Sequence, residues 1–138
     1  MDDIIINKVA SIKNCIKRAK EEFNNSDNFQ SDYSAQDAAI LNIVRACEQA
    51  IDLANHLVKL LDLGVPNNSS DAFEMLSRKR VIDDGLSQKL IKMTGFRNVM
   101  IHEYQKINLE IVVSVINKNL NDLLEFTNLI LKNNSQKS

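Results

Sequence analysis

The sequence predicts an all-α protein, an up-and-down bundle of four long helices and one short helix. Only 3 Gly and 1 Pro occur among the 138 residues, which leaves few residues for the tight turns of a β architecture. Apolar residues recur at alternating spacings of four and three, the period of an amphipathic helix. The chain length suits a single domain, 1–138, with one hydrophobic core.

The first helix is expected from about Asp2 to Phe23, followed by a polar loop over 24–32. It carries one apolar stripe that faces the bundle, made of Ile5, Val9, Ile12, Ile16, Ala19 and Phe23.

The second helix is expected from about Ser34 to Leu63, with Ser34 and Asp37 as a capping pair and Gly64 and Pro66 as its stop signal. Apolar residues occupy two of its faces, which predicts a central helix buried on both sides. One face holds Ile40, Val44, Cys47, Ile51, Ala54, Val58 and Leu61, and the other Ala46, Ala50, Leu53, Leu57 and Leu60.

A short third helix is expected from Ser70 or Asp71 to about Arg80, followed by a loop around 83–85 and a fourth helix that starts near Leu86. The last helix starts after Asn108, which is a plausible cap, and its apolar stripe contains Ile111, Val115, Leu123, Phe126 and Ile130. The polar tail 133–138 is expected to be frayed.

Composition and charge exclude several classes of function. No apolar run approaches the roughly 20 residues that a membrane span needs, and the acidic start Met1-Asp2-Asp3 is unlike a signal peptide. We therefore expect a cytoplasmic protein. A net charge of -1 excludes a protein that coats nucleic acid by charge alone, but it leaves room for a small, locally positive RNA site.

The two cysteines, Cys15 and Cys47, lack the spacing of metal ligands and fall on helical stripes among Ile and Val. They are expected to be reduced core thiols, in preference to a disulfide or a nucleophile.

The segment Arg97-Asn98-Val99-Met100-Ile101-His102-Glu103-Tyr104 places polar and titratable side chains inside an apolar helical pattern. With about 100° per residue, Leu90, Met93 and Met100 line up with Leu86, and Arg97 and Tyr104 fall within the same stripe. A guanidinium buried there without a partner costs several kcal/mol, so it must meet a carboxylate, a phosphate or a second chain.

His102 lies about 140° around the helix from Arg97 and about 7.5 Å further along its axis. If the helix is straight, the two side chains therefore cannot converge on the same atom of a bound molecule. Either the helix ends or distorts before His102, or two copies of the helix face each other across a two-fold axis. The second geometry gives a composite site in a homodimer. Gly95 would then allow a close approach of backbone or RNA, although it is equally compatible with a tolerated helix glycine.

An arginine and a histidine beside a phosphodiester suit RNA cleavage without a metal or cofactor. The histidine transfers a proton near neutral pH, and the arginine stabilises charge in the transition state. No cluster of Asp, Glu and His has the spacing of metal ligands, and His56 is expected to be a structural or interface residue. Because an Arg and a His five apart also occur by chance in helical bundles, this pair alone does not decide between catalysis and structure.

In this segment and its flanks the chain resembles the HEPN superfamily, and within it the HepT toxins of HepT/MNT toxin–antitoxin systems. The pattern of Arg, four residues, His, one residue and Tyr is present without a gap at 97–104. Similar stretches in the same order are Asp3-Ile4-Ile5-Ile6-Asn7-Lys8, Arg45-Ala46-Cys47-Glu48, Ala54-Asn55-His56, Leu63-Gly64-Val65-Pro66 and Asn108-Leu109-Glu110-Ile111-Val112-Val113.

The resemblance implies a homodimeric endoribonuclease whose two motifs form a cleft at the dimer interface. Arg97 and His102 would be the catalytic pair, with Asn98 as a supporting polar group. It also implies a cognate MNT-type nucleotidyltransferase antitoxin that transfers AMP from ATP to Tyr104 and so blocks RNA binding. The rival interpretation is a non-enzymatic helical module that binds a nucleotide or a nucleotidyltransferase through the same cleft, with Tyr104 as an interface aromatic.

Overall fold

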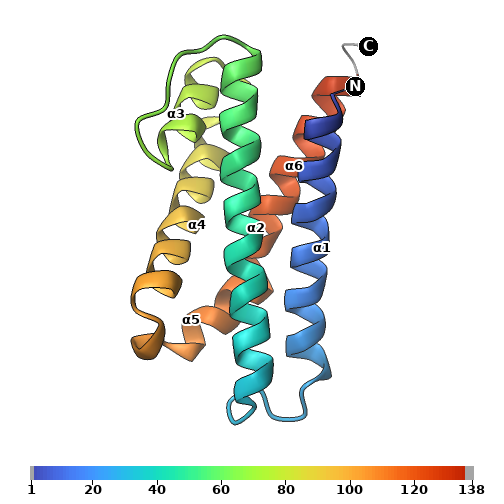
Figure 1. Cartoon of the computed structure of the whole chain (residues 1–138), viewed down its shortest axis with the longest axis vertical. Helices are drawn as coiled ribbons and strands as arrows, with labels where there is room; N and C mark the ends of the chain where they lie inside the picture. Colours follow the sequence, from blue (N-terminus) through green and yellow to red (C-terminus); the bar gives the residue numbers. More distant parts are fainter. Residues whose placement is uncertain (1, 136–138) are drawn as a thin grey trace.

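A computed structural model describes residues 2–135, which contain helices and no strand. The long helices α1 (Asp3–Asn25) and α2 (Tyr33–Leu60) run antiparallel, and the short α3 (Asp71–Arg78) leads into α4 (Asp84–His102) (Figure 1). A 3₁₀ turn, η1 (Tyr104–Lys106), precedes the last helical segments: α5 (Leu109–Ser114), the π-helical turn η2 (Val115–Asn119) and α6 (Leu120–Ser135).

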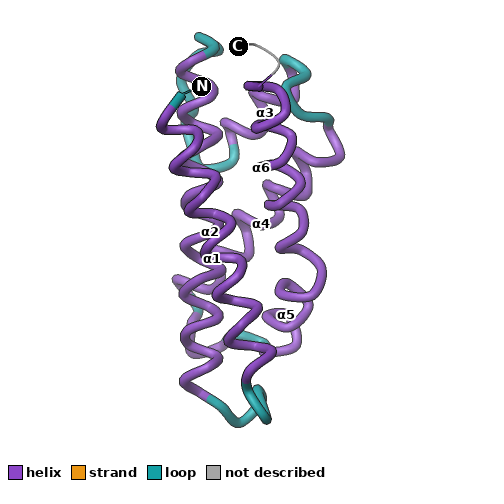
Figure 2. The backbone as a smooth tube through the Cα atoms, turned by 90° about the vertical axis from the view of Figure 1, so that its right-hand side faces the viewer, coloured by secondary structure: helices purple, strands orange, loops and turns teal. Residues whose placement is uncertain are grey.

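Helix α2 is the central element, as its two apolar faces predict. It contacts α1, α3, α4 and α6. Figure 2 shows α1 and α2 on one side of the bundle and α4, α5 and α6 on the other. The buried side chains form one cluster, in which the Phe73 and Phe126 rings meet edge to face at 5.7 Å and join α3 to α6. The all-helical bundle predicted from the sequence is therefore confirmed.

Aspartates cap the N-termini of the first two helices. Asp2 caps α1 and accepts hydrogen bonds from the backbone N–H groups of Ile4 and Ile5. The predicted Ser34–Asp37 cap of α2 is wrong, because Asp32 is the N-cap and accepts from the Ala35 N–H. Helix α2 ends at Leu60, three residues before the expected end, since the following turn contains left-handed conformations at Asp62 (φ 55°) and Gly64 (φ 120°).

Helix α4 begins two residues before the expected start because Asp83 is its N-cap and accepts from the Leu86 N–H at 2.7 Å. The last helix begins after Asn108, as expected, but it is not one regular helix. A π-helical turn interrupts it, and between Asn108 and that turn Ile111 is exposed while Val112 is buried in its place.

Helix α6 continues through 133–135, where a frayed tail was expected, and 136–138 lie outside the described residues. Within the described part of the chain, no helix combines the length and apolar character needed to cross a membrane.

Candidate functional site

Helix α4 carries residues 97–102 of the segment 97–104 and is regular through His102, its last residue. The predicted inward stripe is confirmed, since Leu86, Leu90, Met93 and Met100 are all buried. The helix therefore neither ends nor distorts before His102, and the first of the two geometries that would unite Arg97 with His102 does not occur in this chain.

Arg97 is half-buried and lies between α4 and the loop that joins α2 to α3. Its Nη2 donates a hydrogen bond to the Oγ of Ser69 at 3.0 Å, and its buried Nε has no hydrogen-bond partner. None of the ion pairs found in residues 2–135 involves Arg97. The sequence predicts a carboxylate, a phosphate or a second chain as the partner of this guanidinium. Within residues 2–135 no carboxylate pairs with it, and its partner there is a neutral hydroxyl, which leaves the positive charge uncompensated.

Cys47 lies beneath this arginine in the core. Burial raises the pKa of the Cys47 thiol to about 12, although the positive charge of Arg97 acts in the opposite direction. Its Sγ donates a weak hydrogen bond to the carbonyl oxygen of Met93 at 3.7 Å. Cys15 is half-buried and also free, so the prediction of two reduced thiols is confirmed.

Asn98 and His102 lie on a different, exposed face of α4. With Ile91 and Gly95 they form a stripe at spacings of four, three and four residues. A Cβ atom added at Gly95 would meet no atom within 4 Å, so no described part of the same chain requires a glycine there. A single chain therefore presents the histidine and the asparagine to solvent, turned away from the arginine.

Tyr104 does not continue the buried stripe of α4, which was predicted to extend to it. The helix has ended at His102, and Tyr104 starts the 3₁₀ turn η1, where its side chain is 46% exposed. Its hydroxyl donates a hydrogen bond to Oδ1 of Asp37, on the second turn of α2. This places the phenol at the surface, close to the end of α4 that carries His102.

His56 has a structural partner, as expected. Its Nε2 lies 2.7 Å from Oδ2 of Asp2, so the side chain links α2 to the N-cap of α1. The hydrogen bond from His56 is the main reason why the pKa of Asp2 lies below its ordinary value.

Comparison with known proteins identifies the family. The family described as ribonuclease HepT-like matches residues 12–130. The chain belongs to this family. This HepT-like chain is 45% identical over 130 residues to a Shewanella oneidensis protein named mRNA nuclease HepT, covering 94% of the chain and 98% of that protein. It is also 34% identical over 85 residues to a putative RNase of Archaeoglobus fulgidus, covering 62% and 64% of the two chains.

Solved structures agree with this assignment. A tri-AMPylated Shewanella oneidensis HEPN toxin in complex with MNT antitoxin matches with a TM-score of 0.90 and 44% identity, covering 96% of this chain and 99% of that one. The cytosolic protein YutE of Bacillus subtilis matches with a TM-score of 0.77 at 15% identity, over 95% and 91% of the chains, and shares the fold.

Two side chains of the HepT-like site were not foreseen from the sequence. Ser69 belongs to a polar loop 28 residues before Arg97, and Asp37 lies 67 residues before Tyr104. Nothing in the sequence pattern connects either pair, because their contacts depend on how the α2–α3 loop and η1 pack against neighbouring helices.

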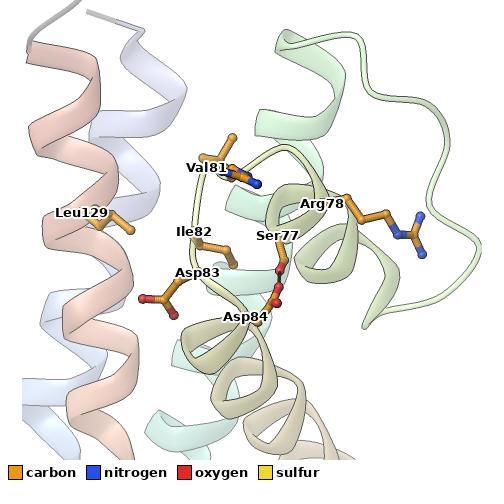
Figure 3. A pocket seen from close by; sticks show the side chains of 8 residues that line it. Ser77, Arg78, Val81, Ile82, Asp83, Asp84 and Leu129 are labelled. Carbon is orange, nitrogen blue, oxygen red and sulfur yellow. Dashed lines mark hydrogen bonds between the residues drawn. The ribbon is translucent and has the colours of Figure 1, made fainter.

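A separate hollow of about 640 Å³ lies between α6 and the loop that joins α3 to α4 (Figure 3). Leu129 lines it from α6. On the wall opposite Leu129, Ser77 donates a hydrogen bond to the neighbouring Asp84. It contains none of the residues predicted for the site. In the described part of the chain, no three His, Cys, Asp or Glu side chains are grouped as they would be around a metal ion.

Proposed function

We propose that this HepT-like chain is the toxin of a toxin–antitoxin pair and acts as an endoribonuclease in the cytoplasm. The observation that carries the proposal is the guanidinium of Arg97, which is half-buried and, among residues 2–135, is bound to a hydroxyl and neutralised by no carboxylate. An RNA phosphate satisfies such a group better than water does, because a guanidinium binds phosphate oxygens through two parallel hydrogen bonds. The similarity to a protein named mRNA nuclease supports the same substrate class.

The proposed chemistry uses Arg97 and His102 without a metal or cofactor. The histidine accepts the proton of the 2′-hydroxyl or donates a proton to the leaving oxygen. The arginine stabilises the negative charge that develops around the pentacoordinate phosphorus. Asn98, on the same face as His102, supplies a further hydrogen bond. Single-stranded or loop RNA is the expected substrate, because its 2′-hydroxyl can rotate into line with the scissile bond.

The active form we propose is a homodimer with two composite sites. Arg97 and His102 diverge by about 140° on a regular helix, so Arg97 of one protomer must act with the partner's His102. The stripe through Gly95 supports this arrangement, since the missing side chain lets a second helix or an RNA strand approach the backbone closely. The exposed apolar side chains Leu41 and Ile101 offer further contact area.

We propose that a cognate MNT-type nucleotidyltransferase inactivates the toxin by transferring AMP from ATP to Tyr104. The related Shewanella toxin is described as tri-AMPylated and in complex with MNT antitoxin. In this chain, the phenol is exposed and lies two residues beyond His102. Added AMP would bring bulk and negative charge to the place where RNA phosphates bind.

The decisive experiment measures cleavage of a fluorescent single-stranded RNA by the purified protein and by the variants Arg97→Ala and His102→Ala. Both variants should lose at least about a hundredfold in kcat/KM, the usual size of a general acid–base contribution. His56→Ala is the control, because it removes the chain's other histidine at a distance from the site. Full cleavage by either site variant would refute the proposed pair, and a monomer in sedimentation that still cleaves RNA would refute the composite site.

A further inference from the structure

We propose that Asp37 accepts the proton of Tyr104 when the phenol is nucleotidylated, so that the toxin supplies the base for its own inactivation. The inference rests on the proposed function, because it concerns the chemistry of the same modification. Its basis is the hydrogen bond from the Tyr104 hydroxyl to Oδ1 of Asp37. A phenol attacks phosphorus far more readily when a carboxylate removes its proton during the attack.

The backbone holds both Asp37 and Tyr104 in place. Asp37 lies on a regular turn of α2, between the buried residues Ala35 and Ala39. The turn that carries Tyr104 is fixed independently of the phenol, by hydrogen bonds from the Lys106 N–H to the Glu103 carbonyl oxygen and from the Ile107 N–H to the Tyr104 carbonyl oxygen. The carboxylate therefore meets the phenol without ordering a flexible segment first.

A purely structural role explains this contact less well. Both side chains are exposed, and an exposed hydrogen bond adds little stability because water replaces it at small cost. The backbone hydrogen bonds already close the turn. The contact does, however, keep the reactive oxygen at the surface, where an enzyme that carries a nucleoside triphosphate can reach it.

The step is balanced with the nucleoside triphosphate as co-reactant. The phenol oxygen of Tyr104 forms a bond to the α-phosphorus, the bond from that phosphorus to the bridging oxygen of pyrophosphate breaks, and the phenol proton passes to Asp37. Pyrophosphate leaves with the bonding electrons, and Asp37 then releases the proton to water. The product is a phosphodiester with one negative charge, which the restored carboxylate repels. Modification thus replaces an attractive contact with a repulsive one and turns the nucleotide away from α2.

The surface beside the phenol suits a phosphate. A hollow of about 420 Å³ is lined by residues 101–106 and contains three further titratable groups, which are His102, Glu103 and Lys106. Lys106 is the group in this hollow that carries a permanent positive charge at neutral pH. It can stabilise the charge that develops on the α-phosphate during the transfer.

The test measures how fast the intact mass of the toxin rises by AMP units in the presence of ATP and the nucleotidyltransferase encoded beside it. Wild-type protein is compared with Asp37→Asn, Asp37→Glu and the control Asp27→Asn, which removes an exposed carboxylate from the α1–α2 loop. We expect Asp37→Asn to react about a hundredfold more slowly near neutral pH, and Asp37→Glu to recover part of the rate. RNA cleavage by each unmodified variant reports that it is folded.

The pH profile separates proton transfer from positioning. Without the carboxylate, the phenol must ionise by itself, so the rate of Asp37→Asn should rise about tenfold per pH unit towards the ordinary phenol value near 10. The ratio of the wild-type rate to the Asp37→Asn rate should therefore fall between pH 6 and 9. The titration of His102, Glu103, Lys106 and the partner enzyme is common to both proteins and cancels in this ratio.

Each outcome has a distinct meaning. If wild-type toxin gains no AMP, the proposed inactivation fails, whatever Asp37 does. If wild-type toxin is modified and Asp37→Asn reacts at the same rate, the role of Asp37 is refuted while the proposed function stands. A slower Asp37→Asn reaction with an unchanged pH profile also overturns proton transfer, since it reduces Asp37 to a group that orients the phenol.

Discussion

The contact between Ser69 and Arg97 leads to a quantitative prediction about catalysis. The change is Ser69→Ala, which removes the hydroxyl oxygen that accepts a hydrogen bond from Nη2 of Arg97 at 3.0 Å. Hydrogen bonds to charged groups contribute about 1.5–3 kcal/mol, and the lower value applies because both side chains are only half-buried. If this energy holds the guanidinium in its reactive orientation, kcat/KM for RNA cleavage should fall about tenfold.

The matched control is Ser70→Ala, one residue further along the same loop. Ser70 occupies the N-cap position of α3, but its side chain makes no capping hydrogen bond. The Ser70→Ala variant should therefore retain wild-type activity. The Ser69→Thr variant should preserve most activity because threonine keeps the hydroxyl. In the background of Arg97→Ala, Ser69→Ala should have no additional effect, since the two residues act through one contact. Equal activities of Ser69→Ala, Ser70→Ala and wild type would refute the reasoning.

Three further predictions concern chemistry and stability elsewhere in the chain. Cys47, whose pKa is raised to about 12, should resist iodoacetamide at pH 8 in the folded protein and react after denaturation. Rapid alkylation of Cys47 in the folded protein, detected by mass spectrometry, would contradict its burial. The pKa of Asp2 is depressed in the folded state, so its contribution to stability is present above the ordinary carboxyl value and is lost as pH falls through the folded value. Asp2→Asn should therefore lower the melting temperature at pH 6 but not well below about pH 4, and a constant difference across this range would contradict the linkage. Phe126→Ala should reduce the free energy of unfolding in urea by about 3–5 kcal/mol, because the buried ring packs against Phe73; a loss below about 1 kcal/mol would show that the core refills the space.

Most of the fold follows from local pattern. The stripe from Ile5 to Ala19 and the two faces of α2 determine which sides are buried, and the structure agrees with both except at Leu60, which lies at the end of α2 and is exposed. The cap at Ser34 was mispredicted because Asp32, two residues earlier, competes for the same backbone donors and also accepts a hydrogen bond from Ser26. A local pattern cannot rank two capping residues when their tertiary partners are unknown.

The site was only partly predictable for a related reason. The spacing of Arg97 and His102 correctly indicated that they diverge, since α4 is regular between them. Extending the same helix to Tyr104 ran past its end, because no Gly or Pro marks the end at His102. The partners of Arg97 and Tyr104 come from 28 and 67 residues away, and such contacts are set by packing.

The π-helical turn at Val115–Asn119 gives the last helical run one residue that the path of a regular helix does not require. It holds one residue more than an α-helical turn would, so residues on its two sides differ in phase by about 100° from a straight helix. Val112 and Leu123, on either side of the turn, are both buried. Five residues of a π-helical turn advance about as far round the axis as four residues of an α-helix, so deleting one codon within 115–119 would restore a regular helix and leave α5, the Asn108 cap and the connection that carries Tyr104 on their present sides. An in-frame loss of a single exposed residue there should therefore be less damaging to the toxin than the same loss within the regular turns of α6.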